Sequence, residues 1–173
     1  MDGGREAEAA PVNNRTTVER TSDREVVVTR TFDAPARLVF EAWTRAELFA
    51  RWWVPKSMGM SLLACDLDVR VGGRYRLAFA QEASAPAEFF GRYIEVTPHS
   101  RLAWTNEEGG SDGSVTTVTF EEQDGKTLLT VHELYASKGA LDAAGTGAAD
   151  AMVETFAQLD ELLLTLDADE RRS

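Results

Sequence analysis

The spacing of hydrophobic residues changes twice along the chain. A run rich in β-branched residues from Glu25 to Phe32 predicts a first strand, which stops at Asp33-Ala34-Pro35. Apolar residues then recur at helical spacing, first in residues 38–43 and again in residues 48–53. These two groups predict two short, consecutive helices directly after the first strand.

From Met60 to Trp104 the period of the pattern becomes two, which predicts strands with one buried face. Gly72-Gly73 lies between the first two of these strands and is typical of a tight turn. Further along, Asp124-Gly125 is a dipeptide that strongly favours a twisted hairpin turn. The predicted strands fall at residues 65–70, 74–79, 88–96, 101–106, 114–122 and 126–135.

A single apolar stripe marks the C-terminal segment. Its residues recur at helical steps, whereas the acidic residues of the segment lie away from the centre of the stripe. The pattern predicts a helix from about Gly147 to Asp167, which would be ~30 Å long. The stripe consists of Met152, Phe156, Leu159, Leu163 and Leu166.

Short turns between the strands make the predicted sheet mostly antiparallel, and its apolar face needs a cover that only the C-terminal helix can provide. The sequence therefore predicts an α+β fold in which a curved sheet of about six or seven strands wraps this helix, with the two short helices at one end. Residues 24–167 would form this single domain. Residues 1–23 are predicted to be a disordered polar tail and residues 168–173 a short C-terminal tail.

Composition indicates one ordinary globular core and narrows the range of partners. The 173 residues are 43% hydrophobic and carry a formal charge of −11 with no run of Lys or Arg, so nucleic acid and anionic lipid surfaces are poor partners. No stretch approaches the ~20 apolar residues of a membrane helix, and the first residues lack the apolar core of a signal peptide. We therefore expect a cytoplasmic protein that does not insert into membranes.

Motifs for metal binding or nucleophilic catalysis are missing from the sequence. His99 and His132 fall in different predicted elements, and neither a His-Glu-x-x-His motif nor paired cysteines occur, so no metal is expected. Cys65 is the single cysteine and alternates with apolar residues, which is typical of a small core residue. Gly145-Thr146-Gly147 lacks the third glycine of a nucleotide fingerprint. These patterns assign no catalytic residue and no cofactor.

Four segments match, in the right order, the signatures of one protein family. They are Phe32-Asp33-Ala34-Pro35 with Val39–Thr44 and Trp52-Trp53-Val54-Pro55; Asp68–Tyr75; Gly91–Pro98 with Arg101–Trp104; and Thr127–His132. With them the chain resembles, over roughly residues 24–166, the activator-of-heat-shock-protein-ATPase homologue branch of the START and birch-pollen-allergen-like (SRPBCC) superfamily. The resemblance implies the helix-grip fold.

Two departures from the family pattern fall at the expected mouth of a cavity. Val54 stands where the family commonly has glycine. The Gly-Trp pair often found before the last helix is replaced by a stretch of small residues from Gly139 to Ala151. We interpret residues 139–147 within this stretch as a loop that would supply a mobile lid.

The wrapped sheet and the resemblance together imply an internal cavity of the order of a few hundred Å³, of the kind that holds small ligands. We expect it to bind a hydrophobic or aromatic molecule, lipid-like or polyketide-like, that enters beside Trp52-Trp53 and the loop before the last helix. Glu133 and the polar members of the lining would orient the ligand. The expected lining is Phe40, Trp43, Leu48, Trp52, Trp53, Tyr75, Phe79, Phe89, Tyr93, Trp104, His132, Met152 and Phe156.

Two other functions remain open at this point. The first is an enzyme of the cyclase or dehydratase type, in which His132 or Glu133 would be the acid–base group in the same cavity. The second is the stimulation of a heat-shock-protein ATPase, which the family name implies and which would need an exposed patch for the partner. The superfamily permits a monomer or a symmetric homodimer.

Overall fold

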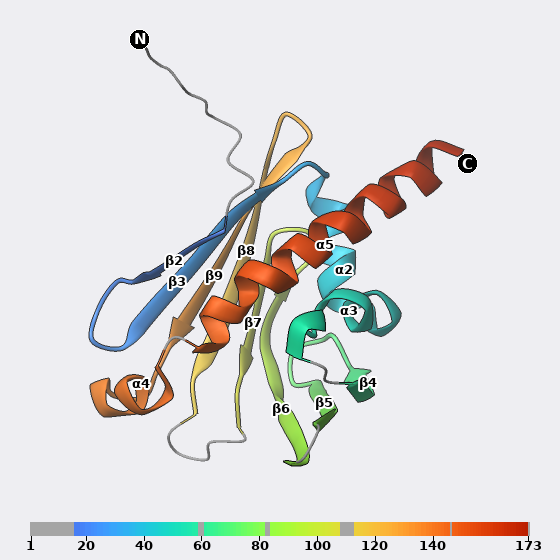
Figure 1. Ribbon diagram of the computed structural model, residues 1–173. Helices are drawn as coiled ribbons and strands as arrows, with labels where there is room; N and C mark the ends of the chain where they lie inside the picture. Colours follow the sequence, from blue (N-terminus) through green and yellow to red (C-terminus); the bar gives the residue numbers. More distant parts are fainter. Residues whose placement is uncertain (1–15, 59–60, 82–83, 108–112, 146, 173) are drawn as a thin grey trace.

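The computed structural model describes residues 16–58, 61–81, 84–107, 113–145 and 147–172. In these ranges eight strands form one antiparallel sheet in the order β2-β3-β9-β8-β7-β6-β5-β4. The sheet curves around a long C-terminal helix, α5 (Figure 1). The strands are β2 Thr17–Arg20, β3 Glu25–Phe32, β4 Ser61–Leu67, β5 Arg74–Gln81, β6 Ser84–Thr97, β7 Arg101–Thr105, β8 Val115–Gln123 and β9 Lys126–Leu134.

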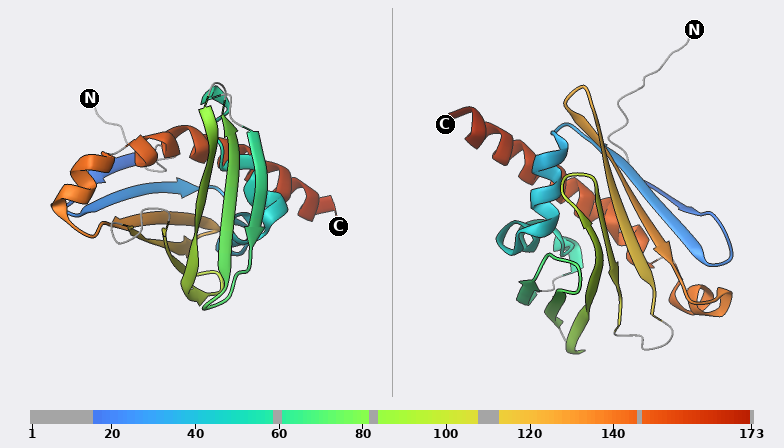
Figure 2. Two further views of the ribbon diagram at one scale, coloured as in Figure 1. Left: turned by 90° about the horizontal axis from the view of Figure 1, so that it is seen from below. Right: turned by 180° about the vertical axis from the view of Figure 1, so that it is seen from behind.

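The helices sit on the concave side and at the ends of this sheet. Figure 2 shows that β4, β5 and β6 turn away from β3, β8 and β9, and that α5 crosses the concave face between the two groups. This arrangement is the helix-grip architecture, so the predicted fold class is confirmed. The helices are α2 Ala36–Thr44, α3 Ala46–Trp52, the short 3₁₀ helix η1 Lys56–Met58, α4 Lys138–Ala144 and α5 Gly147–Arg172.

Local sequence signals explain where several elements begin and end. The first strand has the predicted bounds, and α2 begins directly after Pro35. The backbone N–H of Ala36 donates to Glu122 Oε1 at 2.8 Å, which places a carboxylate at the positive end of the helix. Asp124 and Gly125 have φ angles of 56° and 78°, the left-handed geometry of the predicted hairpin turn between β8 and β9.

Three segments differ from the sequence prediction. Thr17–Arg20 lies in the predicted tail but forms β2, which pairs with β3 from Thr17 opposite Thr29 to Arg20 opposite Val26. This strand is short and mostly polar, and its pairing with β3 and the packing of Val18 against the core hold it in place. Residues 138–144, which overlap the loop predicted at residues 139–147, form α4, and α5 continues to Arg172, past the predicted end. Residues 1–15 of the predicted tail lie outside the described residues.

The core lies between α5, the α2–α3 pair and the sheet. Phe156, Leu159 and Leu163 of α5 are buried, as the stripe predicted. The Trp52 indole N–H donates to the Ala42 carbonyl at 2.9 Å and closes the corner between α2 and α3. In the described part of the chain no helix has the combination of length and apolar character needed to cross a membrane.

Candidate functional site

A row of inward-facing residues runs across five strands near the α4 end of the sheet. Strand register places Val26 of β3 opposite Glu133 of β9, and Glu133 opposite Thr116 of β8. Thr116 in turn lies opposite Trp104 of β7, and Trp104 opposite Tyr93 of β6. We call these five residues the polar row, because a buried carboxyl, a buried hydroxyl and a tyrosine stand among its apolar members.

A chain of hydrogen bonds, in which each residue donates to the next, connects the polar row to its neighbours. The Thr116 hydroxyl donates to Glu133 Oε1. Asn106 Nδ2 donates to Thr116 Oγ1 at 2.9 Å. The Tyr75 hydroxyl lies 2.9 Å from both Asn106 Oδ1 and the Thr105 carbonyl, so its single proton can serve either acceptor. The chain of donors therefore leads from Tyr75 through Asn106 and Thr116 to the carboxyl group of Glu133.

The next row of the sheet is wholly apolar and sealed. Val28, Val131, Val118 and Leu102 stand opposite one another in register, and each is 0% exposed. The polar row is therefore the boundary between a dry core and the α4 end of the interior. The side chains around that end are only half-buried, namely Trp104, Asn106, Ser114, Tyr135 and Met152.

The two tyrosines near this end of the interior, Tyr135 and Tyr93, have raised pKa values. Burial raises the pKa of the Tyr135 hydroxyl above its usual value, and the nearby Glu133 carboxylate raises it further. Burial also raises the pKa of Tyr93 in the polar row, with smaller contributions from Cys65 and Asp68. Both phenols therefore remain protonated at neutral pH and are available as neutral hydrogen-bonding groups.

Aromatic rings fill the interior under α2 and α3 and reach the polar row, where the ring centroid of Trp104 lies 6.0 Å from that of Trp43. Trp43 packs against Trp52 and Phe156 with ring centroids 4.8 and 6.2 Å apart, and its indole N–H is a buried donor without a partner among the described residues. Trp53 stacks on Phe79 with centroids 5.2 Å apart and an interplanar angle of 10°. Eight residues of the predicted cavity lining are buried, namely Phe40, Trp43, Leu48, Trp52, Tyr75, Phe79, Tyr93 and Phe156.

The remaining members of the predicted lining divide between the two ends and the outer face. Trp104 is half-buried in the polar row, with its ring centroid 6.0 Å from that of Trp43, and Met152 is half-buried near the start of α5. Trp53 is half-buried in the aromatic end, and Phe89 beside it is 37% exposed. The structure thus brings the aromatic part of the predicted lining together, but most of it packs as core rather than facing open space.

His132 does not belong to the interior, and its assignment to the cavity was wrong. It alternates with the buried residues Val131 and Glu133, so its side chain lies on the outer face of β9. There its Nε2 lies 2.6 Å from Glu25 Oε2. The hydrogen bond from Ser22 is the largest cause that lowers the pKa of Glu25, and the bond with His132 is the second.

The segment after α3, where the ligand was predicted to enter, is bonded to α5. Gln158 Nε2 donates to the carbonyls of Trp52 and Val54 at 2.9 Å each, and Gln158 Oε1 accepts the Lys56 N–H at 3.0 Å. Ser57 donates from its backbone and its hydroxyl to the carboxylate of Glu154, and these bonds hold the pKa of that carboxyl below its usual value. The aromatic end is therefore tied to the helix.

The helix α4 follows β9 and lies at the end of the sheet where β9 ends, beside the hairpin between β2 and β3 (Figure 1). Its first turn is capped by Ser137, whose hydroxyl accepts the Ala140 N–H at 3.0 Å. Leu141 is 0% exposed and anchors the helix to the core. Gly145 ends it with a φ of 69°. The predicted glycine-containing loop is thus a capped helix, and its action as a lid stays a prediction.

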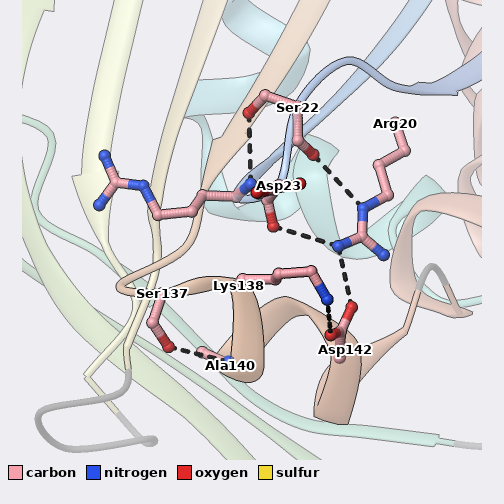
Figure 3. Close-up of polar contacts among 8 residues, drawn as sticks. Arg20, Ser22, Asp23, Ser137, Lys138, Ala140 and Asp142 are labelled. Carbon is pink, nitrogen blue, oxygen red and sulfur yellow. Dashed lines mark hydrogen bonds and ion pairs between the residues drawn. The ribbon is translucent and has the colours of Figure 1, made fainter.

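Charged side chains clip α4 to the hairpin between β2 and β3 (Figure 3). Arg20 donates from Nη2 to Asp142 Oδ1 at 2.8 Å and to the Asp23 carbonyl at 3.1 Å. Lys138 donates from Nζ to Asp142 Oδ2 at 2.8 Å. Asp142 therefore joins the helix to a hairpin that is distant in sequence.

We call the bonds of Asp142 with Arg20 and Lys138 the clip. Replacing Asp142 with alanine is expected to speed hydrogen exchange in α4 while leaving the melting temperature nearly unchanged, because the clip lies on the surface. The hydrogen bond from Lys138, and then that from Arg20, hold the pKa of Asp142 below its usual value. The clip is therefore present above about pH 4 and is lost as the pH falls through the lowered folded-state pKa. Exchange mass spectrometry of residues 136–145 should show a difference between variant and wild type at pH 7 that diminishes as the pH is lowered below the usual carboxyl pKa. Residues 156–163 of α5 are the internal control, and equal α4 exchange at pH 7 would refute the clip.

Two other features, Cys65 and a groove on the outer face, are weaker candidates for a functional site than the polar row. Burial, and to a smaller extent Asp66, raise the pKa of Cys65 to about 11, so the thiol is protonated and behaves as a core residue. A groove of about 450 Å³ on the outer face is charged, and Arg76 there bonds Glu88 at 2.5 Å. Among the described residues no three His, Cys, Asp or Glu side chains are grouped to hold a metal ion.

The structure also contains polar residues that the sequence reasoning missed. Thr116 is two residues from Val118 and four from Phe120, and this spacing places all three on the inner face of β8. Asn106 follows β7 directly and was assigned to the end of a strand without a role. The spacing of buried positions in β8 could have identified Thr116. The bonds of Asn106 reach β5 and β8, and the sequence pattern does not reveal that these strands lie near it.

An antiparallel sheet wrapped around a long C-terminal helix, with a mixed polar and aromatic inner face at one end, defines a helix-grip protein. Residues 33–164 match the family described as "Activator of Hsp90 ATPase homolog 1-like protein", and the chain belongs to this family. The family resemblance seen in the sequence is thereby confirmed.

Solved structures agree with this assignment at the level of the fold. A crystal structure of a protein from Rhodobacter sphaeroides has a TM-score of 0.78 at 24% identity, over 87% of this chain and 99% of that one. A solution structure of a protein from Staphylococcus epidermidis has a TM-score of 0.72 at 26% identity, over 86% and 94%. An AHSA1-like protein from Aeromonas hydrophila has a TM-score of 0.59 at 21% identity, over 79% and 94%. No curated protein matches this chain.

Proposed function

We propose that this protein binds a hydrophobic or aromatic small molecule between the sheet and α5, at the end of the interior nearer α4. The observation that carries the proposal is the polar row. Buried hydrogen-bonding groups are costly inside an apolar core, and a packed core has no need of them. Here the buried Glu133 and Thr116 lie in register with the half-buried Trp104, and a polar group among apolar side chains is typical of small-ligand sites.

Apolar burial would supply most of the affinity, and the polar row would supply selectivity. A ligand that buries about 200 Å² of apolar surface gains roughly 5 kcal/mol from burial. Part of this gain is offset by the lost freedom of the ligand and of the side chains that it orders. Because lipid-like and polyketide-like molecules gain similarly from burial, the hydrogen bonds with the polar row would decide between them.

Thermal unfolding in the presence of a panel of lipophilic and aromatic compounds tests this proposal. A compound at a hundred times its Kd adds about 2.7 kcal/mol of stability, which raises the Tm of a domain of this size by roughly 5–11 °C. Met152→Trp adds bulk at the α4 end and should reduce the shift. Val153→Trp, whose position on the same helix is 51% exposed, should leave it intact. A panel in which no compound raises the Tm would contradict the proposal.

The inward position of Glu133 favours one further candidate. In an enzyme of the cyclase or dehydratase type this carboxyl group would donate or accept the proton, whereas His132 lies on the wrong face for that role. Mass spectrometry of a bound compound after incubation distinguishes the two functions. A binder returns the compound unchanged, whereas an enzyme changes its mass and the Glu133→Gln variant does not.

The other expectations from the sequence stay predictions. Stimulation of a heat-shock-protein ATPase, which the family description names, would be tested by adding this protein to a purified Hsp90 ATPase. A homodimer would be tested by light scattering. The expected cytoplasmic location and the expected lack of nucleic-acid partners follow from composition alone.

A further inference from the structure

We infer that the ligand carries an uncharged hydrogen-bond acceptor, such as the carbonyl oxygen of an aromatic ketone, and that the indole N–H of Trp43 and the hydroxyl of Tyr93 donate to it. This inference rests on the proposed binding function and specifies the chemistry of the ligand. It follows from two inner-face donors that have no acceptor in the described part of the chain, and from the ring of Trp104, against which both of them pack.

The indole of Trp43 is a donor that the fold leaves unused. Trp43 is 3% exposed, and its Nε1 has no hydrogen-bond partner among the described residues. Its neighbours are aromatic rings, with centroids 6.5 Å away for Phe120 and 6.2 Å away for Phe156, and phenyl rings have no lone pair to accept its proton. Buried donors in proteins are nearly always paired, because leaving one unmet is costly. The acceptor for Trp43 is therefore to be sought outside the chain.

The adjacent Trp52 shows that this aromatic cluster can satisfy an indole from within. Trp52 is 1% exposed, and its N–H donates to the Ala42 carbonyl at 2.9 Å. The ring centroids of Trp43 and Trp52 are only 4.8 Å apart, so the two indoles share one environment and differ in what their N–H groups meet. Packing explains both rings, but only the N–H of Trp52 contributes a bond to the folded chain. A ligand acceptor would give the N–H of Trp43 a role.

A second donor without an acceptor packs against the same half-buried ring. Tyr93 is 4% exposed, and its hydroxyl makes no hydrogen bond to a described residue. Burial raises the pKa of this hydroxyl, so it keeps its proton at neutral pH. The ring centroid of Trp104 lies 6.2 Å from that of Tyr93 and 6.0 Å from that of Trp43. A flat molecule that packs on Trp104 therefore has two neutral donors beside it.

The surroundings of these donors favour an acceptor without charge. A carbonyl oxygen has two lone pairs and can accept from an N–H and from an O–H at once. A carboxylate would bring a charge among aromatic rings, and the buried cation of the described residues, Arg30, already lies 3.3 Å from Asp160 Oδ2. An aromatic ketone combines a flat apolar surface for stacking on Trp104 with the oxygen that the two donors need.

Tetralin and α-tetralone are suitable probes, because they share one bicyclic skeleton and differ by a carbonyl oxygen. Each is titrated at pH 7 by calorimetry, and proton–nitrogen NMR spectra follow the indole groups. In an apolar site without donors tetralin would bind more tightly, since a ketone gives up its hydrogen bonds to water. We expect α-tetralone to bind at least as tightly as tetralin. We also expect α-tetralone, but not tetralin, to shift the indole proton of Trp43 downfield, as a new hydrogen bond does.

Variants that remove one donor at a time test each residue. Trp43→Phe and Tyr93→Phe should each lower the affinity for α-tetralone, relative to that for tetralin, at least about threefold, the usual effect of losing one hydrogen bond. Trp52→Phe is the control, because it truncates the neighbouring indole, whose N–H is already bonded to Ala42. It should leave the ratio of the two affinities as in the wild type. Replacing Trp43 by its benzothienyl analogue, which has sulfur in place of the N–H, removes the donor at nearly constant volume.

The outcomes separate this inference from the function on which it rests. If neither probe and no member of the lipophilic panel binds, the proposed function fails. If tetralin binds and α-tetralone binds more weakly without moving the Trp43 signal, the function stands and the inference is overturned. An unchanged affinity ratio in folded Trp43→Phe overturns the role of Trp43, and one in folded Tyr93→Phe overturns that of Tyr93. If the variants do not fold, the Trp43 signal of the wild-type protein still decides.

Discussion

Replacing Phe156 with alanine is expected to lower the free energy of unfolding by about 3–5 kcal/mol, the usual loss for a buried aromatic residue. Phe156 is 0% exposed. Its ring centroid lies 5.7 Å from that of Phe32 on the sheet and 6.2 Å from those of Trp43 and Trp52. A single truncation therefore leaves a void where α5, β3, α2 and α3 meet. For a domain of this size the loss corresponds to a fall of roughly 6–20 °C in Tm.

Val153→Ala is the matched control for this prediction. It also removes apolar atoms from α5, but Val153 is 51% exposed, so its stability should change by no more than about 0.5 kcal/mol. Urea unfolding monitored by tryptophan fluorescence measures both variants. A Phe156→Ala protein within 1 kcal/mol of wild type would mean that α5 does not pack on the sheet in this way.

The fold was predictable because its two periodicities are strong. The stripe that contains Phe156 and Leu159 marks the one helix that can cover a sheet, and the alternating segments mark strands with one buried face. Asp124-Gly125 also identified the β8–β9 turn from local backbone chemistry alone. The strand β2 escaped prediction because pairing with β3 holds it, and pairing leaves no pattern in a four-residue polar segment.

The site was harder to predict than the fold, because it depends on the parity of single residues. His132 and Glu133 are neighbours on β9, and a shift of one residue exchanges the face on which each lies. The hydroxyl that bonds Glu133 belongs to Thr116 of β8, and Asn106, which donates to that hydroxyl, follows β7, so their meeting is a property of the sheet order and not of any local motif. The aromatic residues were difficult for another reason, because too many of them were assigned to the cavity. Most of the predicted lining proved to be core, since large rings serve packing and ligand binding equally well.

The same sheet contains a position where one methyl group should be damaging. Gly91→Ala is expected to destabilise the protein by several kcal/mol, because a β-carbon at this position would lie 1.8 Å from the Thr105 carbonyl oxygen and 2.9 Å from Tyr75 Cε2. The carbonyl belongs to the backbone of β7 and cannot move without breaking the β6–β7 pairing. The ring of Tyr75 would be displaced as well, and its hydroxyl would leave Asn106.

Gly139→Ala is the control, since a β-carbon there meets nothing closer than Ser137 Oγ at 3.8 Å. This substitution lies in α4 and should be neutral or stabilising by up to about 1 kcal/mol. Thermal unfolding compares the two variants, and a Gly91→Ala protein that is recovered only as aggregates agrees with the expectation. A soluble Gly91→Ala variant with the wild-type Tm would show that β6 and β7 do not approach so closely. In that case the hydrogen-bond chain from Tyr75 to Glu133 would lose its structural basis as well, because the same close approach holds the Tyr75 hydroxyl beside Thr105.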